Sequence, residues 1–309
     1  MKRLSFPMAL ALILALAPPA PDVLGGSLGS QAVPEDTTVT LLGAGKAPRR
    51  PLRYRYRAGD SVEMNMDMTM SMGMELMGRV VPPQTMPTMR MAAVLTVTRV
   101  APGGDSTIDI LLKDLSLVGT GGFSAAQRQQ FAAAMAPLKG FKGSMVVSNR
   151  GVTKGFTYKT PAGLDPAAQQ ILQNLSNQMK QLSTPLPKEP VGLGARWRVV
   201  IPLKAPPITM ASRIEFNLEA LTADSARLGM KVDGWAPTQP LAIPGMGRLS
   251  ANLKSLSVTG QGRTTLSLLR PAASGQMTAK QTLDAEFPVG GATHAMKMLM
   301  EMKMDVTSK

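Results

Sequence analysis

The feature that most constrains this chain is a strict alternation of methionine with polar residues in two stretches far apart in the sequence. In the first stretch, residues 62–76, apolar side chains occupy the even-numbered positions, and polar or small residues occupy the odd ones. A period of two places alternate side chains on opposite faces of a β-strand. The methionines of this stretch are Met64, Met66, Met68, Met70, Met72 and Met74. The second stretch repeats the pattern with Met296, Met298, Met300, Met302 and Met304. Each stretch therefore predicts a long strand with one methionine-covered face and one polar face.

Composition limits what can fill the core and what chemistry the chain can perform. The 309 residues are enough for one large or two ordinary domains. Cysteine is absent, which excludes disulfides, thiolate metal sites, thiol catalysis and an acylated lipobox cysteine. Only seven Phe, three Tyr and two Trp are present, so methionine and aliphatic residues must fill the interior. Methionine is a flexible and polarisable core residue.

Residues 1–32 have the pattern of a secretory signal peptide. Lys2 and Arg3 precede an apolar run, Leu4–Ala17, that is too short for a membrane-spanning helix. The small residues that follow predict cleavage after Ala32. We therefore expect a periplasmic or secreted protein.

The net charge of the chain is strongly basic, at +14. The densest basic run is Lys46–Arg57, and it lacks the interleaved aromatic residues typical of a nucleic-acid surface. An excess of positive charge attracts anionic partners over long range. For an exported protein we expect the partner to be an anionic surface of the cell envelope, and no nucleic acid.

The chain order predicts a flexible leader followed by two lobes. Residues 33–50 are polar and rich in Gly, Pro and basic residues, which is typical of a mobile segment. We expect a first β lobe with two helices over residues 51–184 and a second β lobe over residues 185–309. The proline-rich strap Pro185–Pro190 marks the boundary between them.

The two helices are expected at Ser124–Leu138 and Asp165–Leu182. Ser124 with Gln127 forms a capping-box pattern, and Asp165 followed by proline is a helix start signal. Both segments carry an apolar stripe. The fold class we predict is mainly β (α+β), a long antiparallel curved sheet or half-barrel with the two amphipathic helices packed on one face.

Two further points of architecture remain open at this stage. The second half repeats some strand-and-turn patterns of the first, which suggests an internal duplication, although any β meander looks self-similar at hairpin spacing. An alternative fold is two successive β sandwiches divided near Pro185–Pro190. In either fold we expect the methionine strands 64–74 and 296–304 to lie in one sheet and share one core, because each apolar face needs cover.

The chain also resembles a known group of proteins. The Gly59-Asp60 entry into the methionine-rich strand, together with the segment Leu186–Trp197, resembles an uncharacterised family of exported, methionine-rich bacterial β proteins of unknown function. The resemblance spans most of residues 50–308. It implies the β architecture and no mechanism. Some members resemble lipoproteins, whereas this chain has no cysteine for a lipid anchor.

Residues for catalysis are scarce. His294 is the only histidine, which excludes histidine pairs and multi-histidine zinc sites, and its place after Gly290-Gly291 is typical of a turn or surface residue. The carboxylates Glu63, Asp67 and Glu75 lie on the polar face of one strand, where solvation explains them. We therefore expect a protein that is not an enzyme and needs no cofactor.

The methionine faces allow three interpretations. They can fill a core in a structural or interaction module of the cell envelope. They can line an adaptable concavity for an apolar or amphipathic ligand such as a lipid, since methionine surfaces are frequent where binding is promiscuous. They can bind Cu(I) or Ag(I), because thioethers prefer soft metals. The ligand concavity is the function we predict, with both methionine sets as its ligand-binding residues and no separate metal site.

Overall fold

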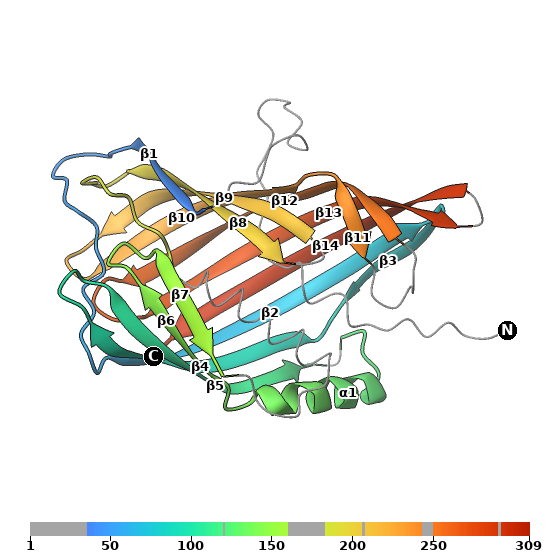
Figure 1. Ribbon diagram of the computed structural model, residues 1–309, viewed down its shortest axis with the longest axis horizontal. Coiled ribbons are helices and arrows are strands. Elements are labelled where there is room, and N and C mark those ends of the chain that lie inside the picture. Colours follow the sequence, from blue (N-terminus) through green and yellow to red (C-terminus); the bar gives the residue numbers. More distant parts are fainter. Residues whose placement is uncertain (1–35, 120, 160–182, 206–207, 243–249, 290–291) are drawn as a thin grey trace.

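The computed structural model describes residues 36–119, 121–159, 183–205, 208–242, 250–289 and 292–309. Strands dominate the described residues (Figure 1). The strands are β1 Thr38–Gly43, β2 Ser61–Leu76, β3 Arg79–Thr85, β4 Thr88–Val100, β5 Ser106–Val118, β6 Lys142–Val147, β7 Thr153–Tyr158, β8 Arg196–Ala205, β9 Ile208–Leu221, β10 Ser225–Ala236, β11 Gln239–Ala242, β12 Ser250–Ser267, β13 Ala273–Val289 and β14 Ala292–Ser308. The prediction of a mainly β protein is confirmed.

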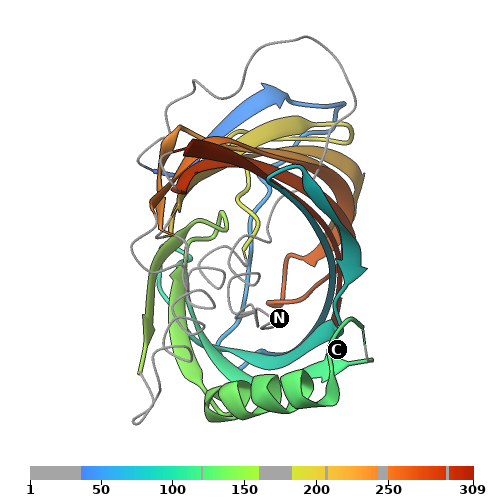
Figure 2. The same cartoon turned by 90° about the vertical axis from the view of Figure 1, so that its right-hand side faces the viewer.

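All of these strands belong to one antiparallel sheet. Its main path runs β1-β8-β9-β10-β12-β13-β14-β2-β4-β5-β6-β7, with β11 paired to β12 and β3 paired to β2. Figure 2 shows that the sheet curves strongly around its concave side. Within the described residues β1 and β7 are not paired with each other, so the sheet stays open. The alternative of two successive sandwiches is wrong, because both halves of the chain share this sheet.

The centre of the sheet joins the two halves of the chain. Residues of the first lobe supply β2 to β7, and residues of the second supply β8 to β14. The two blocks meet where β14 pairs with β2 over thirteen residue pairs, from Met296 opposite Leu76 to Ser308 opposite Met64. The predicted placement of the two methionine strands in one sheet is therefore confirmed. The described strands on either side of the predicted lobe boundary, β7 and β8, are not paired with each other and lie toward opposite ends of the sheet path.

The core lies on the concave face. Along β2, β4 and β14 buried residues alternate with more exposed ones, as a sheet with one solvated face requires. The buried residues form four neighbouring clusters that follow this face from β6 and β7 across β2 and β14 to β8. Charged side chains point to the convex side. The arrangement makes one continuous apolar surface on the inside of the curve.

One of the two expected helices is present among the described residues. Helix α1, Ala125–Met135, has Ser124 as its N-cap, and both hydrogen bonds of the capping box with Gln127 are formed. A short 3-10 turn, η3 Ala136–Leu138, extends it. Met135 and Leu138 are buried in the core cluster at β4 and β5, and Figure 1 shows α1 beside β5. The second helix, expected at 165–182, lies outside the described residues, and the internal duplication is not confirmed.

The expected leader, residues 33–50, contains a strand. Thr38–Gly43 forms β1 and pairs with β8. The physical reason is a short alternation in which Val39 and Leu41 pack on the core cluster around Trp197. A free edge of β8 gives this segment a partner, and apolar alternation outweighs the Gly- and Pro-rich composition around it.

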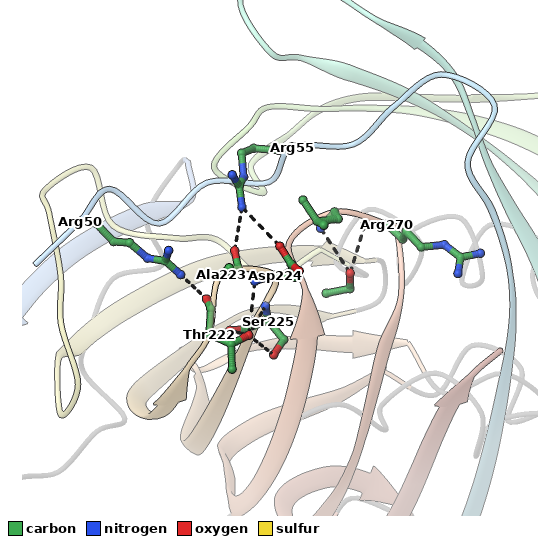
Figure 3. A network of polar contacts seen from close by, with 9 residues as sticks. Arg50, Arg55, Thr222, Ala223, Asp224, Ser225 and Arg270 are labelled. Atoms are coloured by element: carbon green, nitrogen blue, oxygen red, sulfur yellow. Dashed lines mark hydrogen bonds and ion pairs between the residues drawn. The ribbon is translucent and has the colours of Figure 1, made fainter.

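The segment from Arg50 to Arg57 runs across one end of the sheet without joining a ladder. Its arginines donate to neighbouring turns (Figure 3): Arg50 to the carbonyl of Thr222, and Arg55 to the carbonyl of Ala223 at 2.7 Å. Arg55 also lies 3.9 Å from a carboxylate oxygen of Asp224. These contacts hold the crossing segment against the β9–β10 turn.

The proline strap is fixed by hydrogen bonds to its carbonyl groups. Arg53 donates to the carbonyls of Pro187 and Lys188, and the indole N–H of Trp197 donates to that of Pro185 at 3.0 Å. The Tyr54 hydroxyl donates to the carbonyl of Thr184, and burial raises the pKa of that hydroxyl. In segments that join no strand ladder, backbone carbonyl groups thus accept hydrogen bonds from side chains. No helix in the described part of the chain is long and apolar enough to cross a membrane.

Candidate functional site

The structure places both predicted methionine sets side by side on the concave face. In the register of β14 and β2, four methionines of one strand face four of the other, whereas Met296 faces Leu76, and Met66 and Met64 face Val306 and Ser308. Directly opposed residues on neighbouring antiparallel strands point to the same side and lie about 4.5–5.5 Å apart. The opposed pairs are Met298 with Met74, Met300 with Met72, Met302 with Met70, and Met304 with Met68. Four consecutive methionine pairs therefore form a ladder along the middle of the sheet.

The ladder continues onto the strands on either side. On β4, Met91 is opposite Met66 and Met89 is opposite Met68. On β13, Met277 is opposite Met304. Met86 joins the same cluster from the connection between β3 and β4. We call this surface, from β4 through β2 and β14 to β13, the methionine face.

Burial differs along the methionine face. Met68, Met70, Met300 and Met302 are 4–5% exposed and form its centre. The outer members are only partly buried and pack around this centre or against the adjoining clusters. These are Met66, Met72, Met74, Met298 and Met304. Met64 and Met296, at the two ends, are buried in the adjoining clusters.

The methionine face has one polar neighbour that the alternation did not single out. Gln281 lies on β13 opposite Met300 and therefore points to the concave side. It is 5% exposed, and no hydrogen bond of its carboxamide is formed within the described residues. The signal in the sequence was a polar residue at an inward position of a strand that is otherwise apolar there, between Ala279 and Leu283.

The carboxylates of β2 lie on the convex face, as expected. The Glu63 carboxylate accepts from Lys113 at 2.8 Å, and this hydrogen bond lowers the pKa of the carboxyl group. Asp67 accepts two hydrogen bonds from Arg90, at 2.8 and 2.6 Å, which likewise lower its pKa. Both groups are ion-paired and exposed, so they offer no acid with a raised pKa for proton transfer.

His294 lies near the start of β14, two residues after Ala292. It is opposite Phe287, and the two ring centroids are 5.9 Å apart. No group of three or more His, Asp or Glu side chains in the described ranges could hold a metal ion. The chemistry that the described residues do offer at the methionine face is soft and apolar: thioethers, aliphatic groups and one carboxamide.

Comparison with other proteins adds no relative: no protein-family model and no curated protein matches the chain.

Proposed function

We propose that this is an exported, non-enzymatic protein that binds an apolar or amphipathic ligand, such as a lipid, against the methionine face. The observation that carries the proposal is the four-pair methionine ladder on the concave side of an open sheet. A core that needed only to be filled could use branched aliphatic residues, which specify shape better. A continuous methionine surface instead adapts to different ligand shapes, because each side chain has several rotatable bonds.

The partly buried methionines around the centre of the methionine face support an entry route for a ligand. Met72, Met74 and Met298 surround the centre and are less covered than Met300 and Met302. A ligand that displaces flexible thioethers pays little in strain compared with one that displaces packed aromatic rings.

Export and an anionic partner also belong to the proposal. The signal-like segment 1–32 supports a periplasmic or secreted location with cleavage after Ala32, and the net charge of +14 favours contact with an anionic envelope surface. The partner surface must be assembled mainly from cations other than Arg50, Arg53 and Arg55, because these donate to backbone carbonyls of the protein itself.

The competing reading is a structural or interaction module of the envelope whose methionines are simply packed. Its support is the burial of Met68, Met70, Met300 and Met302 at 4–5% exposure. The two readings differ in what the folded protein takes up. Packed cores exclude hydrophobic dyes, whereas an adaptable ligand face binds them.

Native mass spectrometry of the protein purified from its producing cell tests the proposal. We expect a co-purifying small molecule of defined mass, released by organic solvent, and uptake of the uncharged dye N-phenyl-1-naphthylamine after its removal. If no molecule co-purifies and the folded protein does not bind the dye, the carrier function is wrong and the packed module is favoured.

A second candidate function, binding of Cu(I) or Ag(I), is favoured by one specific observation. The opposed pairs Met300–Met72 and Met302–Met70 are consecutive along the ladder, so several thioethers can converge on one ion. Soft sulfur ligands select these metals over harder ones. This function requires that the sulfur atoms be reachable, and therefore also open to oxidation to the sulfoxide.

A further inference from the structure

Gln281 is a buried polar side chain in an apolar environment. Its nearest inward-facing neighbours are Ala279 and Leu283 along β13, Val258 across on β12 and Met300 across on β14. All four are buried and apolar. A carboxamide in such a place costs stability unless it finds hydrogen-bond partners. Buried polar groups in folded proteins nearly always have them.

The position of Gln281 would allow a bound ligand to supply the missing hydrogen-bond partner. It lies beside Met300, at the centre of the methionine face, on a row of opposed residues that crosses the sheet. The row is Ser212, Gly234, Val258, Gln281, Met300 and Met72. Ser212 is the only other polar side chain of this row and is also buried. A molecule lying on the methionine face next to Met300 would have its polar group within reach of the carboxamide.

The same surroundings constrain the charge of that group. None of the four neighbours of Gln281 is charged, and the adjacent Lys280 of β13 pairs with Glu301 of β14 at 2.6 Å on the convex side. An ionised group placed beside Gln281 would lose its hydration without gaining a counter-ion. A neutral hydroxyl, ester or amide would instead exchange hydrogen bonds with an amide that both donates and accepts.

We propose that Gln281 is the hydrogen-bonding anchor of the ligand site, and that the ligand is an amphipathic molecule whose buried polar group is uncharged. The proposal rests on the carrier function above and specifies its substrate class. The methionines supply apolar contact, and the carboxamide fixes where along the face the polar group lies.

The test is displacement of N-phenyl-1-naphthylamine from the mature protein by three chains of similar length: 1-decanol, 1-chlorodecane and decanoate at neutral pH. The variant is Gln281→Met, which keeps an unbranched side chain of similar size and matches the neighbouring methionines. Gln276→Met is the matched control, because Gln276 lies on the same strand and is exposed on the convex face. Circular dichroism and thermal unfolding confirm that both variants fold.

We expect Gln281→Met to weaken displacement by 1-decanol about three- to tenfold, the range of one net hydrogen bond, and to leave 1-chlorodecane unchanged. Gln276→Met should alter neither, and decanoate should displace the dye from the parent less well than 1-decanol does. The ligand-free Gln281→Met variant should be at least as stable as the parent, since it removes a buried polar group that forms no hydrogen bond with the described residues.

Three results would overturn the anchor while leaving the carrier function standing. Unchanged 1-decanol affinity in Gln281→Met would mean that a buried water, or nothing, satisfies the carboxamide. Equal weakening of 1-decanol and 1-chlorodecane would mean that Gln281 matters for shape alone. Decanoate binding as tightly as 1-decanol would contradict the uncharged class. If the parent binds neither the dye nor any chain, the carrier function itself fails, which is a separate outcome.

Discussion

Met70 of β2 lies directly opposite Met302 of β14, although the two residues come from near opposite ends of the chain, and each is 4% exposed. The pair marks the seam at which the N-terminal block of the sheet meets the C-terminal block. Because a one-residue slip in register would turn every methionine of one strand to the convex side, the alternation itself fixes this seam. The methionine face is therefore both the proposed ligand site and the place where the two blocks of the sheet pair.

A charge on this face should be strongly destabilising. Met68, next to Met70 on the same face, is 5% exposed. Met68→Asp would bury a carboxylate without a partner, and we expect a loss of about 3–5 kcal/mol in the free energy of unfolding. Urea denaturation followed by circular dichroism measures it.

Asn65→Asp is the matched control, because it adds the same charge to the same strand on the convex face. We expect a change within about 0.5 kcal/mol, as is usual for surface substitutions. If the two variants lose similar stability, the assignment of the two faces of β2 is wrong.

The ion pair of Asp67 and Arg90 on the convex face should contribute a small, pH-dependent stability. The hydrogen bonds from Arg90 lower the pKa of the Asp67 carboxyl group in the folded protein relative to the unfolded chain. A lowered folded-state pKa gives stability that is present above the unfolded value of about 3.9 and is lost as pH falls through the folded value. Both side chains are substantially solvated, so the contribution is at most about 1 kcal/mol.

Replacing Arg90 by Gln should therefore lower stability near pH 6 and matter progressively less as the pH falls toward 3. Urea denaturation of parent and variant across this range measures the difference. A difference that grows toward acid pH would contradict the sign of the pKa shift. High salt should also reduce the difference at pH 6, because the pair is exposed.

The turn between β2 and β3 carries backbone strain that can be removed. Leu76 and Arg79 are paired, and the two residues between them both have positive φ, 53° at Met77 and 73° at Gly78. This is the conformation that Asn-Gly favours in two-residue hairpins. Met77 is 51% exposed, so its side chain contributes little burial.

Met77→Asn should stabilise the protein by about 0.5–1 kcal/mol, because Asn tolerates the left-handed conformation better than Met does. Met77→Val should do the opposite, since a β-branched residue is disfavoured there. Differential scanning calorimetry would show the expected order of melting temperatures, with Asn highest and Val lowest. The reverse order would mean that the turn adopts another conformation.

Strand periodicity in the sequence is enough to predict that the two methionine strands share one sheet, but it is insufficient to predict strand β3 at its edge. The alternation of 64–74 and 296–304 is long and regular, so the face, and with it the shared core, followed from the residues alone. Strand β3 does not follow from the sequence pattern, because Pro82 and Pro83 cannot donate backbone hydrogen bonds to a ladder. The ladder of β3 with β2 shifts register between Met72 and Met74, opposite the prolines, and this irregularity accommodates them.

Gln281 was missed for a different reason. A polar residue in an otherwise apolar strand can be recognised only when the inward direction of that strand is known. In β13 the odd positions are small or apolar except for Gln281, and the even positions are mostly polar, but only the pairing with β14 shows that the odd positions face the concave side. Tertiary pairing therefore identifies Gln281 as a polar group on the concave side, beside the methionine face.

The choice between a ligand face and a soft-metal site can be tested with a substitution that preserves volume. Replacing Met66, Met68 and Met70 together by Leu removes three thioethers of β2, two of them in the ladder, while keeping apolar volume nearly constant, so the fold should be retained. If the protein binds Ag(I), titration of the parent should shift several methionine methyl resonances in NMR spectra at stoichiometric metal, and the triple variant should lose this binding. Prior oxidation of the parent to sulfoxides should abolish it as well. A variant that binds Ag(I) as tightly as the parent would exclude Met66, Met68 and Met70 from the site. By contrast, uptake of N-phenyl-1-naphthylamine should survive the triple substitution, because leucine supplies the same apolar contact, and this difference separates the two functions.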